Sequence, residues 1–159
     1  MSGFSLNSVE LQKYLHSRYP FLMIDHVDEV IPGVSAKGFK NLTLNEWFFQ
    51  KGLNTPRMPQ TVQIEALEEM LALTVLTIPG NKGMTPRFLS ASIKFIDNVL
   101  VGHKFNIETK VISWRRGILN GTAKGFVNGN VVCEAELMIT IPDILNKYSP
   151  PKIKKFEHN

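Results

Sequence analysis

The longest apolar stretch of the chain lies between residues 58 and 78 and reads MPQTVQIEALEEMLALTVLTI. Pro59 suits the first turn of a helix, where a missing backbone N–H costs nothing, and no glycine or further proline interrupts the stretch. From Met70 onward the sequence is apolar nearly all round, which is typical of a helix buried on most of its faces. The pattern therefore predicts one long helix that other elements must wrap.

The first half of this predicted helix carries a polar face. Thr61, Glu65, Glu68 and Glu69 share that face at helical spacing. Spacing alone favours an ordinary solvated face, whereas burial and like-charged neighbours would raise the pKa of Glu65 and make it a site carboxylate. Glu65 is the candidate catalytic residue, and both interpretations stay open at this point.

Before the long helix, the sequence predicts a short helix within residues 5–15 and a hairpin of residues 21–30 and 35–44. A loop with apolar anchors follows. Behind the helix the apolar residues recur with a period of two, which predicts strands. Their apolar positions are Leu89, Ala91, Ile93 and Phe95, then Phe105, Ile107, Thr109 and Val111, and finally Cys133, Ala135, Leu137, Ile139 and Ile141, with a further strand over 118–127.

These elements predict an α+β fold in which an antiparallel sheet curls around one long central helix. Asn128-Gly129 is the signal of a two-residue hairpin turn between the last two strands. We expect residues 1–142 to form a single domain and residues 143–159 to form a polar, basic and loosely ordered tail.

Composition narrows the class of protein. The chain has 159 residues, of which 43% are hydrophobic, so it is expected to bury one core. A single cysteine, Cys133, excludes an intramolecular disulfide framework and fits a reducing cytoplasm. The N-terminus lacks the pattern of a signal peptide, and the longest apolar run is too short to span a bilayer. We expect a cytoplasmic protein that does not enter a membrane.

The distribution of charged residues argues against nucleic acid as a partner and against a metal site. The net charge of +4 comes from scattered basic residues, without the clustered stripe and stacking aromatics that nucleic-acid binding requires. An acidic protein partner would suit this balance. The four histidines are too dispersed along the chain for a metal site, and we expect neither a metal nor a cofactor.

Several short motifs occur in order along the chain. They are RYPFLMID at 18–25, KNLTLNE at 40–46, FFQ at 48–50, MP at 58–59, IEA at 64–66, IKF at 93–95, VG at 101–102, WRRG at 114–117, NG at 128–129 and EAELM at 134–138. In this order and near this spacing, they resemble the beta-hydroxyacyl-acyl-carrier-protein dehydratases of type II fatty-acid synthesis. The resemblance covers roughly residues 14–142 and implies the hot-dog fold, in which a sheet wraps one long helix and two subunits form a homodimer, or a higher oligomer, with acyl tunnels at the interface.

The resemblance also implies roles for particular residues. Glu65 stands where the long helix of the family contributes its catalytic acid. The substrate, an acyl carrier protein or acyl-CoA thioester, is expected to contact Phe49, Gly52, Leu53, Pro59 and Gln60. The candidates for docking the acidic carrier are Lys51, Arg57, Arg115 and Arg116.

One residue of the family site is absent. The family carries a histidine in a Gly-His-Phe-Pro-Gly loop, whereas this loop reads KGLNTPR at 51–57, is one residue shorter, and places Gly52 or Leu53 where the histidine belongs. Gln60 replaces a glycine at the helix N-terminus, and Glu68 and Glu69 replace small or neutral residues. Dehydration removes a proton alpha to a thioester and expels a beta hydroxyl, and positioned acid–base groups contribute ~10²–10⁴-fold to such rates.

The sequence therefore predicts an acyl-thioester-binding, dehydratase-like protein with negligible dehydratase activity. Two alternatives stay open. Glu65 could serve an acyl-thioester hydrolase whose helix N-terminus polarises the carbonyl, or the chain could be a non-catalytic partner subunit of an active dehydratase. Among the histidines, His16 is the first candidate for a substitute base.

Overall fold

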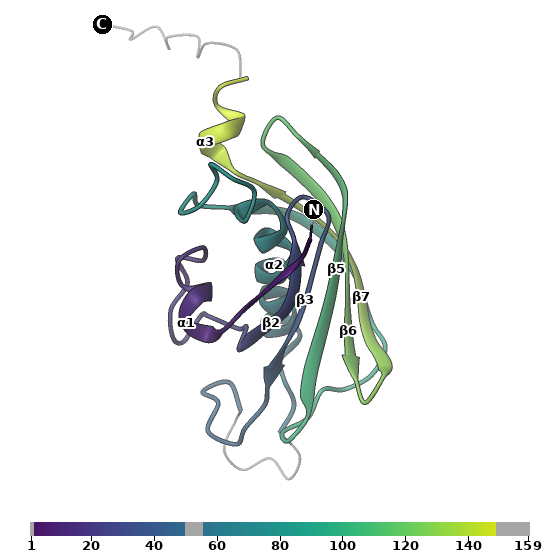
Figure 1. Cartoon of the computed structure of the whole chain (residues 1–159). Coiled ribbons are helices and arrows are strands. Elements are labelled where there is room, and N and C mark those ends of the chain that lie inside the picture. The colour runs from purple at the N-terminus through teal and green to yellow at the C-terminus, as the bar shows by residue number, and fades with distance from the viewer. Residues whose placement is uncertain (1, 50–55, 149–159) are drawn as a thin grey trace, which may run out of the picture.

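A helix of 17 residues, α2 (Gln60–Leu76), lies against the concave side of a seven-stranded antiparallel sheet (Figure 1). The computed structural model describes residues 2–49 and 56–148. The helix begins two residues later than predicted because Pro59, with φ −57° and ψ 144°, is its N-cap rather than part of its first turn. It ends at a cap on Thr77, whose hydroxyl donates to the Leu73 carbonyl at 2.7 Å.

The sheet has the strand order β1-β2-β3-β5-β6-β7-β4. This sheet, curled around one helix, is the hot-dog fold that was predicted. Its strands are β1 (Phe4–Leu6), β2 (His26–Ile31), β3 (Ser35–Asn41), β4 (Arg87–Phe95), β5 (Lys104–Arg115), β6 (Ile118–Val127) and β7 (Asn130–Thr140). Among the described residues, no helix is long and apolar enough to cross a membrane.

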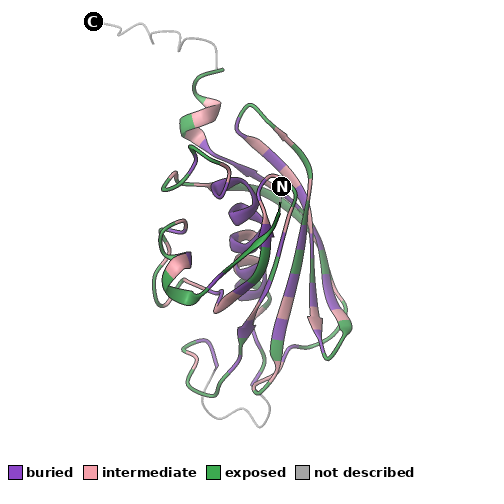
Figure 2. Ribbon diagram, in the orientation of Figure 1, coloured by how far each residue is buried: buried purple, intermediate pink, exposed green. Residues whose placement is uncertain are grey.

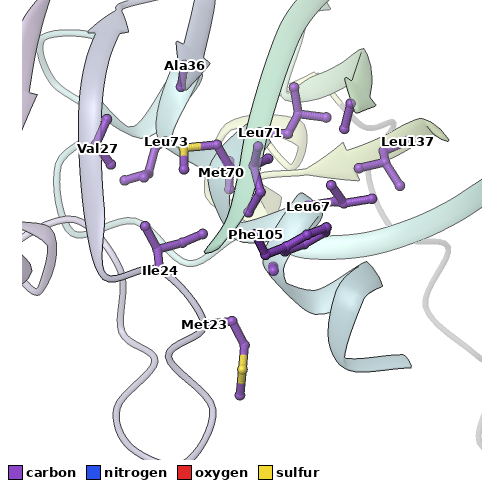
Figure 3. Close-up of a cluster of buried hydrophobic side chains, with 14 of the residues drawn as sticks. Met23, Ile24, Val27, Ala36, Leu67, Met70, Leu71, Leu73, Phe105 and Leu137 are labelled. Atoms are coloured by element: carbon purple, nitrogen blue, oxygen red, sulfur yellow. The ribbon is translucent and has the colours of Figure 1, made fainter. Parts of the chain in front are cut away.

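The core lies between α2 and the sheet (Figures 2 and 3). Every residue of α2 from Glu69 to Leu76 is buried, as its all-round apolar pattern predicts. The helix approaches β6 closely at Gly121, where an added Cβ atom would lie 2.5 Å from a methyl carbon of Leu71 and 2.8 Å from the Lys110 carbonyl oxygen. The absence of a side chain at Gly121 therefore sets the distance between the helix and the sheet.

We expect Gly121→Val to lower the free energy of unfolding by about 2 to 3 kcal/mol, because the added methyl groups must displace Leu71 in a filled core. Chemical denaturation measures the loss. The control is Thr122→Val, which changes the next, half-exposed residue of β6. Equal stability of Gly121→Val and the wild type would contradict this account of the helix–sheet contact.

The N-terminus differs from the predicted helix of residues 5–15. Phe4 and Leu6 pair with β2, opposite Val30 and Val27, and only a single turn, α1 (Ser8–Leu11), is helical. The turn starts at Asn7, whose side chain accepts from the N–H of Glu10, while the Glu10 carboxylate accepts from the N–H of Asn7. Pairing with β2 satisfies backbone groups that the sequence pattern had assigned to a helix.

Two further boundaries were wrong. The first hairpin strand begins at His26 rather than residue 21, because residues 19–25 cross over α2 before they enter the sheet, where the Met23 N–H bonds to the helix. At the other end, a helical turn, α3 (Pro142–Leu145), occupies the start of the predicted tail. Residues 149–159, the remainder of that prediction, lie outside the described residues.

The edge strand β4 is apolar on its inner face, yet little covers it. Phe88, Ala91, Ile93 and Phe95 lie opposite Ile139, Leu137, Ala135 and Cys133 of β7, whose side chains are buried. A register shift between Phe88 and Ser90 puts Phe88, rather than the predicted Leu89, in phase with this face. Phe88 is 41% exposed, because α2 packs mainly on β3, β5 and β6.

Candidate functional site

The first half of α2 has one side that the rest of the chain leaves partly open. Thr61 is exposed and Ile64, Glu65 and Glu68 are half-buried, while the other residues of α2 from Val62 onward are buried. We call these four residues the open stripe of α2. Glu65 and Glu68 therefore lie on the partly exposed face that the sequence predicted, whereas Glu69 is buried and does not lie on it.

Glu69 points into the protein and is 4% exposed. The backbone N–H of Met23 donates to its two carboxyl oxygens at 2.8 and 3.2 Å. The pKa of Glu69 is raised to about 9, mainly by burial; the Met23 hydrogen bond and the Lys40 ammonium oppose the rise, and the charges of Glu65 and Glu68 add to it. Glu69 therefore carries a proton at neutral pH.

The carboxyls of the open stripe are perturbed as well. Burial raises the pKa of Glu65 above its ordinary value. Burial, with the charge of Glu65 as a second cause, raises the pKa of Glu68 to about 7. Glu65 is thus a carboxyl in a partly apolar setting, where it is suited to exchange a proton with a bound molecule.

The start of α2 offers polar groups for which the described residues provide no partner. None of the described side chains caps the helix, and the first turn of any helix leaves N–H groups without an intrahelical acceptor. Gln63, which is 3% exposed, donates from Nε2 to the Met58 carbonyl at 3.2 Å, while its Oε1 atom has no hydrogen-bond partner within the described part of the chain. Nothing in the sequence pattern distinguished this glutamine.

The predicted substrate-binding residues are only partly placed. Pro59 and Gln60 form the N-terminus of α2, two turns or less from Glu65. Phe49 is buried against Phe48, with their ring centroids 4.9 Å apart. Gly52 and Leu53, together with Lys51 from the predicted carrier-docking set, lie outside the described residues.

The predicted carrier-docking arginines do not form one patch on a single chain. Arg57 pairs with Leu100, beside the start of β5, whereas Arg115 ends β5 and Arg116 follows it in the hairpin. The 12 residues of β5 separate the two groups by roughly 36 Å at ~3.3 Å per residue. The Arg116 guanidinium lies over the Tyr148 ring, 5.7 Å from its centroid.

A cleft of about 330 Å³ opens between the segment that crosses α2 and the loop after β3. Lys40, 6% exposed, lines this cleft and places its ammonium 2.8 Å from Glu46 and 3.5 Å from Asp25. Sequence reasoning missed this ion group. Its members lie in the family motifs, but only the folded chain brings them together.

The histidines of the described chain do not offer a free base near Glu65. His16 lies against the Gly83 carbonyl at 2.6 Å, beyond the C-terminal end of α2, whereas Glu65 is near its start. His103 is closer to the segment before α2, but its Nδ1 accepts the Leu100 N–H at 2.9 Å. In the neutral ring its Nε2 then carries the proton. His26 lies in β2, 3.7 Å from Asp28.

A sheet wrapped around one long helix, which presents a half-buried carboxyl on its open stripe, is the architecture of a hot-dog protein. The model of the FabA-like domain matches residues 15–136, so the chain belongs to the FabA-like family. The predicted resemblance is thereby confirmed.

Individual relatives agree with this assignment. The 3-hydroxyacyl-acyl-carrier-protein dehydratase FabZ of Roseiflexus castenholzii is 38% identical over 138 residues, which cover 86% of this chain and 96% of that protein. The same enzyme of Caldicellulosiruptor saccharolyticus is 40% identical over 129 residues, with 80% and 92% coverage. The chain is therefore a homologue of FabZ over nearly the whole length of that enzyme.

Solved structures share the fold at low sequence identity. The dehydratase heterocomplex ApeI:P from Xenorhabdus doucetiae aligns with a TM-score of 0.73 at 11% identity and covers 87% of this chain and 95% of the matched chain. A hypothetical thioesterase from Streptococcus pneumoniae with coenzyme A aligns with a TM-score of 0.55 at 11% identity, over 72% and 83% of the two chains. These similarities support the hot-dog fold alone.

Proposed function

We propose that this chain binds acyl thioesters at Glu65 and has little dehydratase activity by itself. The observation that carries the proposal is the half-buried Glu65, which has a raised pKa and lies on the open stripe of α2, where no described histidine offers a free base. As a FabZ homologue, the chain is expected to work in the cytoplasm on a thioester of acyl carrier protein or coenzyme A.

The chemistry explains why the missing histidine matters. Dehydration takes the α proton from the acyl chain, forms the C2–C3 double bond and expels the β hydroxyl, which must receive a proton to leave as water. One carboxyl with a raised pKa can supply or accept a proton. The reaction, however, needs two proton transfers: one removes the α proton, and the other protonates the β hydroxyl. Imidazole titrates near neutral pH and usually fills the second role. Glu65 alone supports binding better than turnover.

The uncovered face of β4 supports assembly as a homodimer. Phe88, Ile93 and Phe95 lie on the inner face of this strand, which also ends the sheet and leaves a row of backbone groups unpaired. A second copy that adds its own β4 antiparallel would satisfy these groups and cover the apolar face. Such a two-fold arrangement would also bring the Arg57 end of one copy beside the Arg115 and Arg116 end of the other.

We expect Ile93→Asp to convert the dimer into a monomer, because a carboxylate would be buried without a partner in the apolar interface. Sedimentation velocity at a fixed protein concentration measures the change. The control is Ser92→Asp, since Ser92 is exposed and its side chain points to the opposite face of the strand. A dimer that survives Ile93→Asp would place the interface elsewhere.

The proposed function is tested with an acyl-phosphopantetheine thioester and with acylated carrier protein. We expect binding by calorimetry, and a rate of enoyl-thioester hydration ~10²-fold or more below that of a FabZ enzyme that has the histidine. Glu65→Ala should weaken binding by roughly 10-fold or more, because a hydrogen bond to a charged group contributes ~1.5–3 kcal/mol. Glu134→Ala, on the exposed side of β7, is the control. Hydration at ordinary enzymatic rates, or no binding by the wild type, would refute the proposal.

A second candidate is a partner subunit in a mixed dehydratase dimer. The structural neighbour ApeI:P is a dehydratase heterocomplex, and this chain retains the helix carboxylate while it lacks the loop histidine. A histidine-containing subunit could then complete a site that contains Glu65. Co-expression with a FabZ relative and native mass spectrometry distinguish the cases: a mixed dimer supports this candidate, and two separate homodimers contradict it.

A further inference from the structure

The bond between Glu69 and Met23 joins α2 to the segment that crosses over it. Met23 lies 46 residues before Glu69 in the chain, and its N–H donates to a carboxyl that is almost fully buried. Ile24, the next residue, is 1% exposed and packs in the core (Figure 3). The carboxyl of Glu69 therefore holds the segment around Met23 against this side of α2.

Glu69 is also one helical turn from Glu65. Side chains four residues apart on a helix are neighbours, with Cβ atoms ~5–6 Å apart. The charged groups that act on Glu69 are Glu65 and Glu68 of α2 and Lys40 of β3, whose ammonium is already held by Glu46 and Asp25. The proton on Glu69 thus decides whether Glu65 has a neutral or a negative neighbour inside the protein.

We propose that Glu69 is a positioning residue for the Glu65 site: its carboxyl fastens the Met23 segment to α2, and its proton keeps Glu65 free of a second buried charge. The inference rests on the proposed function only in its last step, that Glu65 contacts an acyl thioester. When Glu69 loses its proton, the negative charge repels that of Glu65, so Glu65 takes up protons more readily. Binding at Glu65 then depends on pH through a residue that does not touch the ligand.

Nuclear magnetic resonance tests the coupling without any ligand. In the wild type, we expect the Met23 amide proton and the Glu65 side-chain carbonyl carbon to share a step with a midpoint near pH 9, whereas a step of Glu65 near pH 7 belongs to Glu68. Glu69→Gln retains an acceptor for Met23 and should abolish the shared step near pH 9 in both signals. Glu134→Gln, on the exposed side of β7, should leave both unchanged. The absence of a shared step near pH 9 in the wild type, or its persistence in Glu69→Gln, would overturn the inference.

Two further measurements complete the test. Glu69→Ala should increase hydrogen exchange at the Met23 amide by at least 10-fold relative to Glu69→Gln, because only the alanine removes the acceptor. Acyl-thioester affinity should change with the same alkaline midpoint in the wild type and should lack that change in Glu69→Gln. Equal exchange in the two variants, or equal pH profiles in the wild type and Glu69→Gln, would contradict the inference.

Absence of acyl binding in the wild type would refute the proposed function, while the resonance and exchange measurements would still decide the role of Glu69.

Discussion

Dehydratase activity should rise by ~10²–10⁴-fold when residues 51–57 are replaced by a loop that contains Gly-His-Phe-Pro-Gly and is one residue longer than the native loop. The replacement supplies an imidazole that titrates close to neutral pH, which the native KGLNTPR sequence lacks. The rate of hydration of an enoyl thioester, compared with that of the wild type in the same assay, measures the gain. This is the largest effect that we expect from any change to the chain.

Two matched variants decide whether such a gain comes from the family site. The same loop with alanine in place of the histidine should stay at the wild-type rate, since loop length alone supplies no base. Adding Glu65→Gln to the histidine loop should abolish the gain, because the amide cannot exchange a proton with the substrate. A gain that survives Glu65→Gln would mean that another group provides the acid, and the role proposed for Glu65 would be wrong.

Stability should fall as the pH rises through the neutral range. Burial raises the pKa of Glu68 to about 7 and that of Glu69 to about 9, from an ordinary value of 4.5. The folded protein therefore binds more protons than the unfolded chain between these limits, and the free energy of unfolding decreases with increasing pH. The stabilisation is complete below about pH 4.5 and is lost as the pH passes through about 7 and then about 9.

Glu69→Gln isolates the contribution of the buried carboxyl. The wild type should lose roughly 1 kcal/mol per pH unit through Glu69 between pH 5 and 9, whereas the variant should lose only the part that belongs to Glu68. Urea denaturation at a fixed protein concentration measures both curves, because dimerisation would otherwise shift the apparent stability. Parallel curves for the two proteins would show that Glu69 is not protonated in the folded state.

Several elements could be predicted because their signal is local. The residues from Met70 to Leu76 are apolar on every side of a helix, and a helix of this kind must be buried. Alternation along β7 and the Asn128-Gly129 turn likewise follow from periods and turn chemistry that span a few residues. Where pairing with a distant strand decided the outcome, as at Phe4 and Leu6, the local helix signal was misleading.

The candidate site likewise has features that local sequence predicts and features that only the fold decides. Glu65 is predicted from the sequence because it belongs to a motif on a predictable helix, and residues 51–57 can be seen to contain no histidine because a loop motif is read residue by residue. Helical spacing wrongly grouped Glu69 with the open stripe. Its burial comes from the crossing segment at Met23, which helical periodicity does not describe.

The sequence by itself determined the long helix, the alternating strands and the resemblance to the dehydratase family, since each depends on residue type and short-range order. Only the tertiary structure decided which carboxyl of α2 keeps its proton, which face of β4 stays uncovered, and that Arg57 lies far from Arg115 in one chain. Burial and charge interactions depend on segments that folding brings together, and short-range patterns do not contain that information.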